Sequence, residues 1–209
     1  MDSMIGIAVT SFLVGLSGAM MPGPVLSVTI GETAARIRAG RAGDSSRRAQ
    51  LRAALAGPLV VLGHGLLEIL LIVAVILGLG KVLGRGPIIG TVGVLGGGVL
   101  LWMGWGMLAG LRTLRLSAAE ESSSRMHPVL AGILTSLSNP YWAIWWAGVG
   151  LNYIAHSLQF GLLGLTFFYL GHILSDLAWY SSVSVSLALG RRLLTDRTYR
   201  GLVTACAVF

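Results

Sequence analysis

Charged residues are scarce in this sequence. Only 11% of the 209 residues are charged, whereas soluble domains usually carry about 25%. Hydrophobic residues make up 55%, and the mean hydropathy is +0.80. This composition excludes a water-soluble globule, and the abundance of Leu, Val and Ile excludes an intrinsically disordered chain. The sequence therefore predicts an all-α, polytopic membrane protein.

Cysteine and acidic residues are also few. The single cysteine, Cys206, excludes a disulfide framework and a Cys-x-x-Cys redox pair. Eight acidic residues against 15 basic ones give a net charge of +7, which by itself is compatible with nucleic-acid binding. However, the basic residues are confined to connections between apolar runs and do not alternate with aromatic residues, so we expect no nucleic-acid partner.

Long apolar runs dominate what remains. Each of five runs reaches the roughly 20 residues that a transmembrane helix needs. They are Ile5–Ile30, Ala53–Gly80, Ile88–Leu111, Val129–Asn152 and Phe160–Gly190. A sixth run begins at Gly201 and stops at Phe209, too short for a core of about 30 Å at about 1.5 Å per residue. We therefore expect six transmembrane segments in one domain, 1–209, with the last segment truncated.

The basic residues predict the orientation in the membrane. Thirteen follow the first, third and fifth runs, and the opposite side has only Lys81 and Arg85. The thirteen are Arg36, Arg38, Arg41, Arg47, Arg48, Arg52, Arg112, Arg115, Arg125, Arg191, Arg192, Arg197 and Arg200. By the positive-inside rule, these connections are cytoplasmic, and both termini lie outside a cell (inner) membrane.

Two stretches of the sequence resemble each other. Leu62–Glu68 and Leu170–Asp176 both read Leu-Gly-His-x-Leu-x-acid, and Pro22-Gly23-Pro24 and Asn139-Pro140 both interrupt an apolar run. These matches predict two repeats of three spans, about 1–112 and 126–209. Because three is odd, the second repeat enters the membrane from the opposite side, as in transporters with inverted repeats.

The proline interruptions are candidate binding sites. Proline ends or kinks a helix but is favoured at the first helical position, particularly after an N-cap such as asparagine. A new helix start inside the membrane exposes N–H groups that suit an anion, here a substrate carboxylate. The candidate substrate-binding residues are Pro22, Gly23, Pro24, Asn139, Pro140 and Trp142. The alternative is that both interruptions are packing kinks.

Glu68 and Asp176 are the two acidic residues inside the apolar runs. An ionisable group at this depth costs about 2.5–3.5 kcal/mol on insertion scales, so it is a functional candidate. His64 and His172 precede them by four residues and share a helix face with them. The two pairs are candidates for proton coupling. Alternatively, each histidine only neutralises its acid, or the four residues bind a divalent metal.

Aromatic and glycine patterns add two weaker signals. Trp142, Trp145 and Trp146 are spaced to line one helix face, either as a cation–π wall for a substrate ammonium or as a packing surface. Glycines within 88–111 predict close helix packing and permit a homodimer. They are Gly90, Gly93, Gly97, Gly104, Gly106 and Gly110.

Taken together, these residues resemble the LysE/RhtB family of amino-acid exporters. The resemblance rests on Pro22-Gly23-Pro24, on Asn139-Pro140, on Gly63 with Glu68, and on about 200 residues in six apolar segments. It implies gradient-driven efflux, with substrate held between two three-helix halves. Glu68 stands where the family usually has Asp, and Tyr141 stands where lysine is common.

We therefore predict a secondary transporter, not an enzyme, that exports amino acids or related zwitterionic or cationic metabolites by proton antiport. No cofactor is expected. The first alternative is a divalent metal-ion exporter that uses His64, Glu68, His172 and Asp176 as ligands. The second is a membrane-embedded enzyme with a His/acid pair as general acid and base, for which Ser175 is the nearest candidate nucleophile.

Overall fold

The computed structural model is helical throughout the residues it describes, which are 3–21, 23–41, 47–83, 85–111, 126–190, 195, 197, 200, 201, 204 and 208. The first half contains α1 (Met4–Ala19), α2 (Pro24–Arg41), α3 (Arg47–Ala54), α4 (Ala56–Ala74), η1 (Val75–Leu79), α5 (Gly80–Leu83) and α6 (Gly86–Gly110). The second half contains α8 (Pro128–Leu137), α9 (Pro140–Trp145), η2 (Trp146–Gly150), α10 (Leu151–Ser157), η3 (Leu158–Phe160) and α11 (Gly161–Leu189). This confirms the predicted all-α class.

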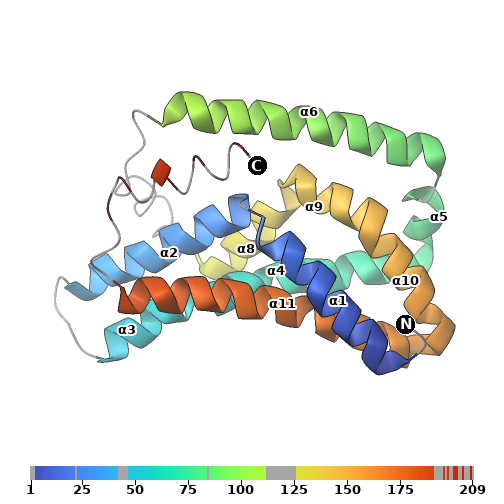
Figure 1. Ribbon diagram of the computed structural model, residues 1–209, viewed down its shortest axis with the longest axis horizontal. Coiled ribbons are helices and arrows are strands. Elements are labelled where there is room, and N and C mark those ends of the chain that lie inside the picture. Colours follow the sequence, from blue (N-terminus) through green and yellow to red (C-terminus); the bar gives the residue numbers. More distant parts are fainter. Residues whose placement is uncertain are drawn as a thin grey trace.

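Several helices are suited to a bilayer. Two continuous helical stretches, Arg47–Val82 and Pro140–Leu189, are long and apolar enough to cross a membrane. The α1–α2 pair makes a third if its two helices, which meet at 74°, count as one broken span. Within the second stretch the backbone turns at Gly161, at φ 67°, and α11 then runs back alongside α1 (Figure 1). The protein is therefore a multi-pass membrane protein.

Two predicted connections are helical instead. Arg36 and Arg38, expected in a loop, lie on α2, because Ala, Arg and Glu favour helix and carry it on to Arg41. The turn expected over 152–159 is also helix, and the reversal occurs at Gly161, which tolerates the positive φ. Some expectations fall outside the described residues, namely those for Arg112, Arg115, Arg125, Arg191, Arg192, Cys206 and most of the run 201–209.

Close backbone contacts join helices of the two halves. A Cβ on Gly63 of α4 would overlap the carbonyl group of Val129 on α8, and a Cβ on Gly171 of α11 would overlap that of Ala8 on α1. Small residues permit such an approach between membrane helices. The two Leu-Gly-His motifs therefore pack against α8 and α1 in corresponding ways, which positions the histidines that follow them.

Four of the six glycines that were predicted to pack closely in α6 do not do so. A Cβ at Gly90, Gly97, Gly106 or Gly110 would meet no atom within 4 Å among the residues described. The helix lies along one edge of the molecule, beside α9 (Figure 1). The expected close packing is therefore absent at these four glycines among the residues described.

Candidate functional site

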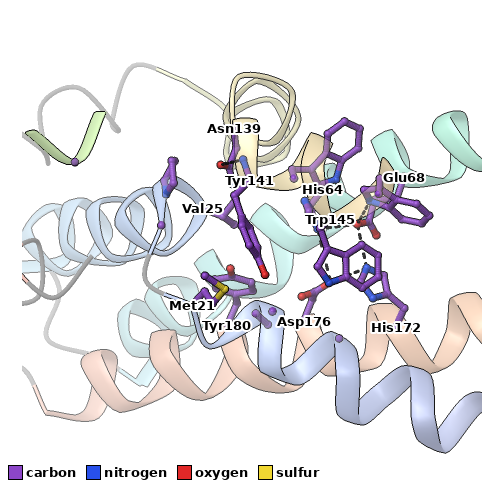
Figure 2. Close-up of a pocket in the computed structure, with 18 of the residues that line it drawn as sticks. Met21, Val25, His64, Glu68, Asn139, Tyr141, Trp145, His172, Asp176 and Tyr180 are labelled. Carbon is purple, nitrogen blue, oxygen red and sulfur yellow. Dashed lines mark hydrogen bonds and ion pairs between the residues drawn. The ribbon is translucent and has the colours of Figure 1, made fainter. Parts of the chain in front are cut away.

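A cavity of about 380 Å³ lies where the two proline interruptions meet α4 and α11 (Figure 2). Its walls come from α1, α2, α4, α6, α9, η2 and α11, with Val208 from the C-terminal region. The polar and aromatic side chains lining it are His64, Glu68, Trp105, Asn139, Tyr141, Trp142, Trp145, Trp146, His172, Asp176 and Tyr180. The volume lies within the usual range for small-molecule sites, about 300–1,000 Å³.

Most of the predicted site residues line this one cavity. They are Gly23, Pro24, His64, Glu68, Asn139, Trp142, His172 and Asp176. Pro140 is the first residue of α9 and does not line it, and Pro22 lies outside the described residues. Residues separated by more than 100 positions in the sequence therefore converge on one space.

The two His/acid pairs form one four-residue cluster rather than two separate pairs. Oε1 of Glu68 lies 3.0 Å from Nε2 of His64 and 3.1 Å from Nε2 of His172. Oδ2 of Asp176 lies 3.6 Å and 3.7 Å from the same two nitrogens. Spacing along the sequence predicts the contact within each helix but not this convergence, which follows from the packing of α4 against α11.

The cluster is withdrawn from solvent. Glu68 is 1% exposed and Asp176 is 4% exposed. Oε2 of Glu68 and Oδ2 of Asp176 are buried without a hydrogen-bond partner among the described residues. Buried carboxylate oxygens are costly unless they bind a proton, a cation or a donor. The arrangement can therefore take up positive charge, whether as a proton, an ammonium group or a metal ion.

The same four residues could also hold one metal ion. One ligand atom from each of His64, Glu68, His172 and Asp176 lies within 4.8 Å of the other three. Two imidazoles and two carboxylates suit a divalent transition metal. The donor set therefore fits the metal alternative as well as the proton alternative.

Indole rings surround the cluster. The Nε1–H of Trp146 donates to Oε1 of Glu68 at 3.1 Å, and the ring of Trp145 stacks on His172 with centroids 4.6 Å apart. Sequence spacing grouped these tryptophans on one face but did not predict the bond to Glu68. Also missed were Ser136, whose hydroxyl lies 2.6 Å from Nδ1 of His64, and Tyr180 in the cavity wall. A hydroxyl within an apolar run was the available signal for Ser136.

The two proline interruptions differ at their new helix starts. Asn139 is the N-cap of α9, as predicted, and its side-chain oxygen accepts a hydrogen bond from the N–H of Tyr141. The carbonyl of Asn139 also accepts from Trp142 and Ala143. The N–H groups predicted to bind an anion at α9 are therefore already occupied. At α2, by contrast, the first intrahelical bond runs from Ser27 to Gly23.

Ser175 does not have the environment of an activated nucleophile. Its hydroxyl donates to the backbone carbonyl of His172 at 2.6 Å, not to an imidazole nitrogen. Serine nucleophiles require a base within hydrogen-bond reach of the hydroxyl. The contact that the enzyme alternative needs is therefore not made by this residue.

Comparison with known proteins identifies the family. Residues 46–209 match the LysE type translocator family, which covers most of the chain. Neither the curated proteins nor the solved structures contain a match. Members of this family are transporters rather than enzymes, and the family indicates export of amino acids or related compounds across a lipid bilayer. The chain therefore belongs to the LysE type translocator family.

Proposed function

We propose that this chain exports an amino acid or a similar zwitterion with an apolar side chain, in exchange for protons. The observation that carries the proposal is the single cavity that joins the buried His/acid cluster, the start of α2 and an aromatic wall. These three features offer a partner for an ammonium group, for a carboxylate and for a side chain.

The carboxylate is assigned to the start of α2. A helix leaves its first N–H groups without intrahelical partners, and after Pro24 these belong to Val25 and Leu26. The positive end of the helix dipole favours an anion at the same place. Asn139 adds its amide nitrogen from the opposite wall, since its oxygen is engaged by Tyr141.

The ammonium group is assigned to the carboxylate oxygens of Glu68 and Asp176 that accept no hydrogen bond from the described residues. Because a proton and an ammonium group compete for the same negative charge, binding one favours release of the other. Such competition at one site is sufficient for antiport when the site opens alternately to each side. The cluster thereby gives the transporter its coupling without a second ion site.

The side chain of the substrate is assigned to the aromatic wall. Tyr141, Trp142, Trp145 and Tyr180 line the cavity. Tyr141 lies between the cluster and the start of α2 (Figure 2). Aromatic surfaces favour apolar groups and also attract a nearby cation. A substrate such as phenylalanine satisfies all three parts of the cavity, whereas a dibasic amino acid brings a second charge with no further acid in the described lining.

Alternating access is assigned to rocking of the two halves, about 1–112 and 126–209. The matching contacts of Gly63 with Val129 and of Gly171 with Ala8 support an inverted repeat of three spans each. The distribution of basic residues supports an inner-membrane location with the termini outside. Because inverted repeats are related by an axis in the membrane plane, a cavity shared by both halves is assigned to the midplane of the bilayer.

The second candidate is export of a divalent metal ion, favoured by the convergence of two histidines and two carboxylates. In that case the ion is the cargo, and the aromatic wall has no direct role. The distinguishing feature is that metal export requires His64 and His172 as ligands but does not require the open start of α2.

The test is counterflow with purified protein in proteoliposomes, with and without a pH gradient. The panel contains labelled phenylalanine, leucine, threonine and lysine, and Zn²⁺, Mn²⁺ and Co²⁺ in a parallel set. We expect exchange of phenylalanine and leucine, accelerated by the gradient. Metal flux without amino-acid exchange would favour the second candidate, and faster exchange of lysine than of phenylalanine would contradict the apolar assignment.

A further inference from the structure

The two histidines of the cluster differ at their second ring nitrogen. Nδ1 of His64 lies 2.6 Å from the hydroxyl oxygen of Ser136 on α8. Nδ1 of His172 is buried without a hydrogen-bond partner among the described residues. Both rings present Nε2 to Glu68 at nearly the same distance. The two histidines therefore differ at Nδ1, on the side of each ring away from Glu68, and not at Nε2.

The cause is a single change between corresponding helices. Gly63 packs against Val129 of α8, and Gly171 packs against Ala8 of α1. Seven residues beyond these contacts lie Ser136 on α8 and Gly15 on α1. A Cβ on Gly15 would lie 2.8 Å from Nδ1 of His172. Gly15 thus occupies the place of Ser136 but has no hydroxyl to offer.

The hydrogen atom of Ser136 has a fixed destination. Its hydroxyl oxygen lies 2.7 Å from the carbonyl oxygen of Gly132. A carbonyl can only accept, so the hydrogen between these two oxygens comes from Ser136. The hydroxyl is then left as an acceptor toward His64, and Nδ1 of His64 must carry a hydrogen.

That assignment determines what faces Glu68. An imidazole with a hydrogen on Nδ1 is either neutral, with a lone pair on Nε2, or positively charged. Since Nε2 of His64 is 3.0 Å from Oε1 of Glu68, one proton must lie between them, on the histidine or on the acid. His172, with a free Nδ1, can instead be neutral and donate its Nε2–H to Glu68.

We propose that Ser136 is a positioning residue that places the exchangeable proton in the contact between His64 and Glu68. His172 is in this view a neutral donor that orients the carboxylate. The inference rests on the proposed proton coupling for its role in transport, but its assignment of hydrogens follows from the contacts of Ser136 alone.

The titratable groups around the contact between His64 and Glu68 come from α4, α9 and α11. Those nearby in the described part of the chain are Glu68 on the same helix, Tyr169, His172, Asp176 and Tyr180 on α11, and Tyr141 on α9. The packed segments of α1 and α8 carry none. Ser136 itself is fully buried and does not line the cavity, so it can orient His64 but cannot reach a substrate.

The first experiment is ¹⁵N NMR of the histidine-labelled chain in nanodiscs, in which the signals of His64 and His172, two of the four histidines, are assigned through His64→Gln and His172→Gln. We expect a hydrogen on Nδ1 of His64 and a bare Nδ1 on His172. In Ser136→Ala, Nδ1 of His64 should become bare, and Ser136→Thr should restore the hydrogen. A bare Nδ1 on His64 in the unmodified protein would overturn the inference, even if Ser136→Ala does not fold.

The second experiment measures phenylalanine efflux driven by a pH gradient. We expect Ser136→Ala to lower the gradient-driven rate about tenfold, the usual scale for losing one hydrogen bond to a charged group, with exchange without a gradient retained. Ser136→Thr should remain near the original rate. Ser11→Ala is the matched control, because Ser11 is equally buried on α1 but bonds the carbonyl of Phe168.

The two experiments separate this inference from the proposed function. If the unmodified protein exchanges no amino acid, the proposed function fails, and the NMR signals still decide the assignment of hydrogens. If exchange occurs and Ser136→Ala keeps the full gradient-driven rate with its His64 signal unchanged, the positioning role is wrong while amino-acid export stands.

Discussion

The break between α1 and α2 and the break between α8 and α9 border the same cavity, yet their helix starts are in different states. At α9, Asn139 accepts from the N–H of Tyr141 with its side chain and from two more N–H groups with its carbonyl. At α2, Gly23 has no side chain, and among the described residues the bond at the helix start runs from the N–H of Ser27 to the carbonyl of Gly23. Related positions thus provide one closed terminus and one open terminus.

The histidines show the same kind of difference. His64 has a hydroxyl behind it, and His172 has Gly15. In both cases one helix carries a polar side chain where its counterpart carries glycine. Under the proposed repeat, Gly23 leaves the start of α2 available to a ligand, whereas the proposed proton position lies beside Ser136 and not beside Gly15. Four sets of substitutions test how far this division of roles extends.

The largest effect is expected where the two halves are alike. Gly63→Ala and Gly171→Ala place a methyl group on the backbone of Val129 and of Ala8, which cannot move as a side-chain end can. Each should destabilise the fold by about 3 kcal/mol, the upper part of the range for overpacking. Thermal unfolding in detergent, followed by circular dichroism, measures the loss.

The matched control is Gly148→Ala, because a Cβ at Gly148 meets no atom within 4 Å. Its melting temperature should remain close to that of the unmodified protein. If Gly63→Ala strongly lowers the melting temperature and Gly171→Ala does not, the two helix contacts do not correspond.

The next effect separates the two acids. Oε1 of Glu68 contacts His64, His172 and Trp146, whereas Asp176 lies beyond hydrogen-bond distance from both histidines. Glu68→Gln removes the charge shared by both histidines. It should lower the rate of gradient-driven efflux at least about 100-fold, the scale of losing an acid–base group. Asp176→Asn should also abolish coupling, but with more exchange remaining in the absence of a gradient.

Glu32→Gln provides the control for these variants. Glu32 falls just beyond the apolar run Ile5–Ile30, and it lies buried on α2, 3% exposed, with Arg36 at 3.9 Å. Its substitution is chemically identical but does not touch the cluster, so efflux should persist. Rates like those of the unmodified protein in both Glu68→Gln and Asp176→Asn would refute the role given to these acids.

The third set of substitutions changes the start of α2. Gly23→Asn supplies a side-chain acceptor of the kind that Asn139 provides at α9, and space is available because a Cβ at Gly23 meets only the carbonyl of Met21, at 3.9 Å. The new oxygen should occupy the N–H groups assigned to the substrate carboxylate. We expect the KM for phenylalanine export to rise about tenfold with little change in kcat, as for lost ground-state binding.

Gly23→Ala separates the acceptor from the added bulk. It introduces the same Cβ without an oxygen, so its KM should stay near that of the unmodified protein. An equal rise in KM for both variants would show that space at residue 23 matters, and that the N–H groups of α2 do not bind the carboxylate.

The sequence was sufficient for the features that depend on short spacing. The interruption at Asn139-Pro140, the acids within apolar runs and the repeated Leu-Gly-His motif are all readable within a few residues, and each has its predicted local structure. The pairing of His64 with Glu68 likewise follows from positions four apart on a helix.

Contacts between helices were beyond that reach. The bond of Trp146 to Glu68 and the contact of Ser136 with His64 join residues 78 and 72 positions apart, and they depend on how α4 packs against its neighbours. The sequence predicted an anion site at α9 from Asn139, and the side chain of this residue accepts from the N–H of Tyr141 instead. A sequence does not reveal whether an N-cap accepts from its own helix or leaves those N–H groups to a ligand.

The smallest effect is expected at that closed terminus. Asn139→Ala removes the acceptor of the Tyr141 N–H, and loss of an N-cap costs about 1 kcal/mol of stability. Asn139→Asp retains an oxygen at the same place and should retain the stability, although its charge should hinder a substrate carboxylate. Differential scanning measurements of the two variants, together with the KM for phenylalanine, separate the two roles of this side chain.

The comparison between the termini depends on this last result. If the asparagine serves mainly as a cap, Asn139→Ala lowers the melting temperature and changes the KM by less than about threefold, because the lost amide is one weak donor among several. If instead its KM rises as much as that of Gly23→Asn, the two helix starts share the carboxylate. The starts of α2 and α9 would then form one binding site for the carboxylate. Only the two histidines would still differ in role between the halves.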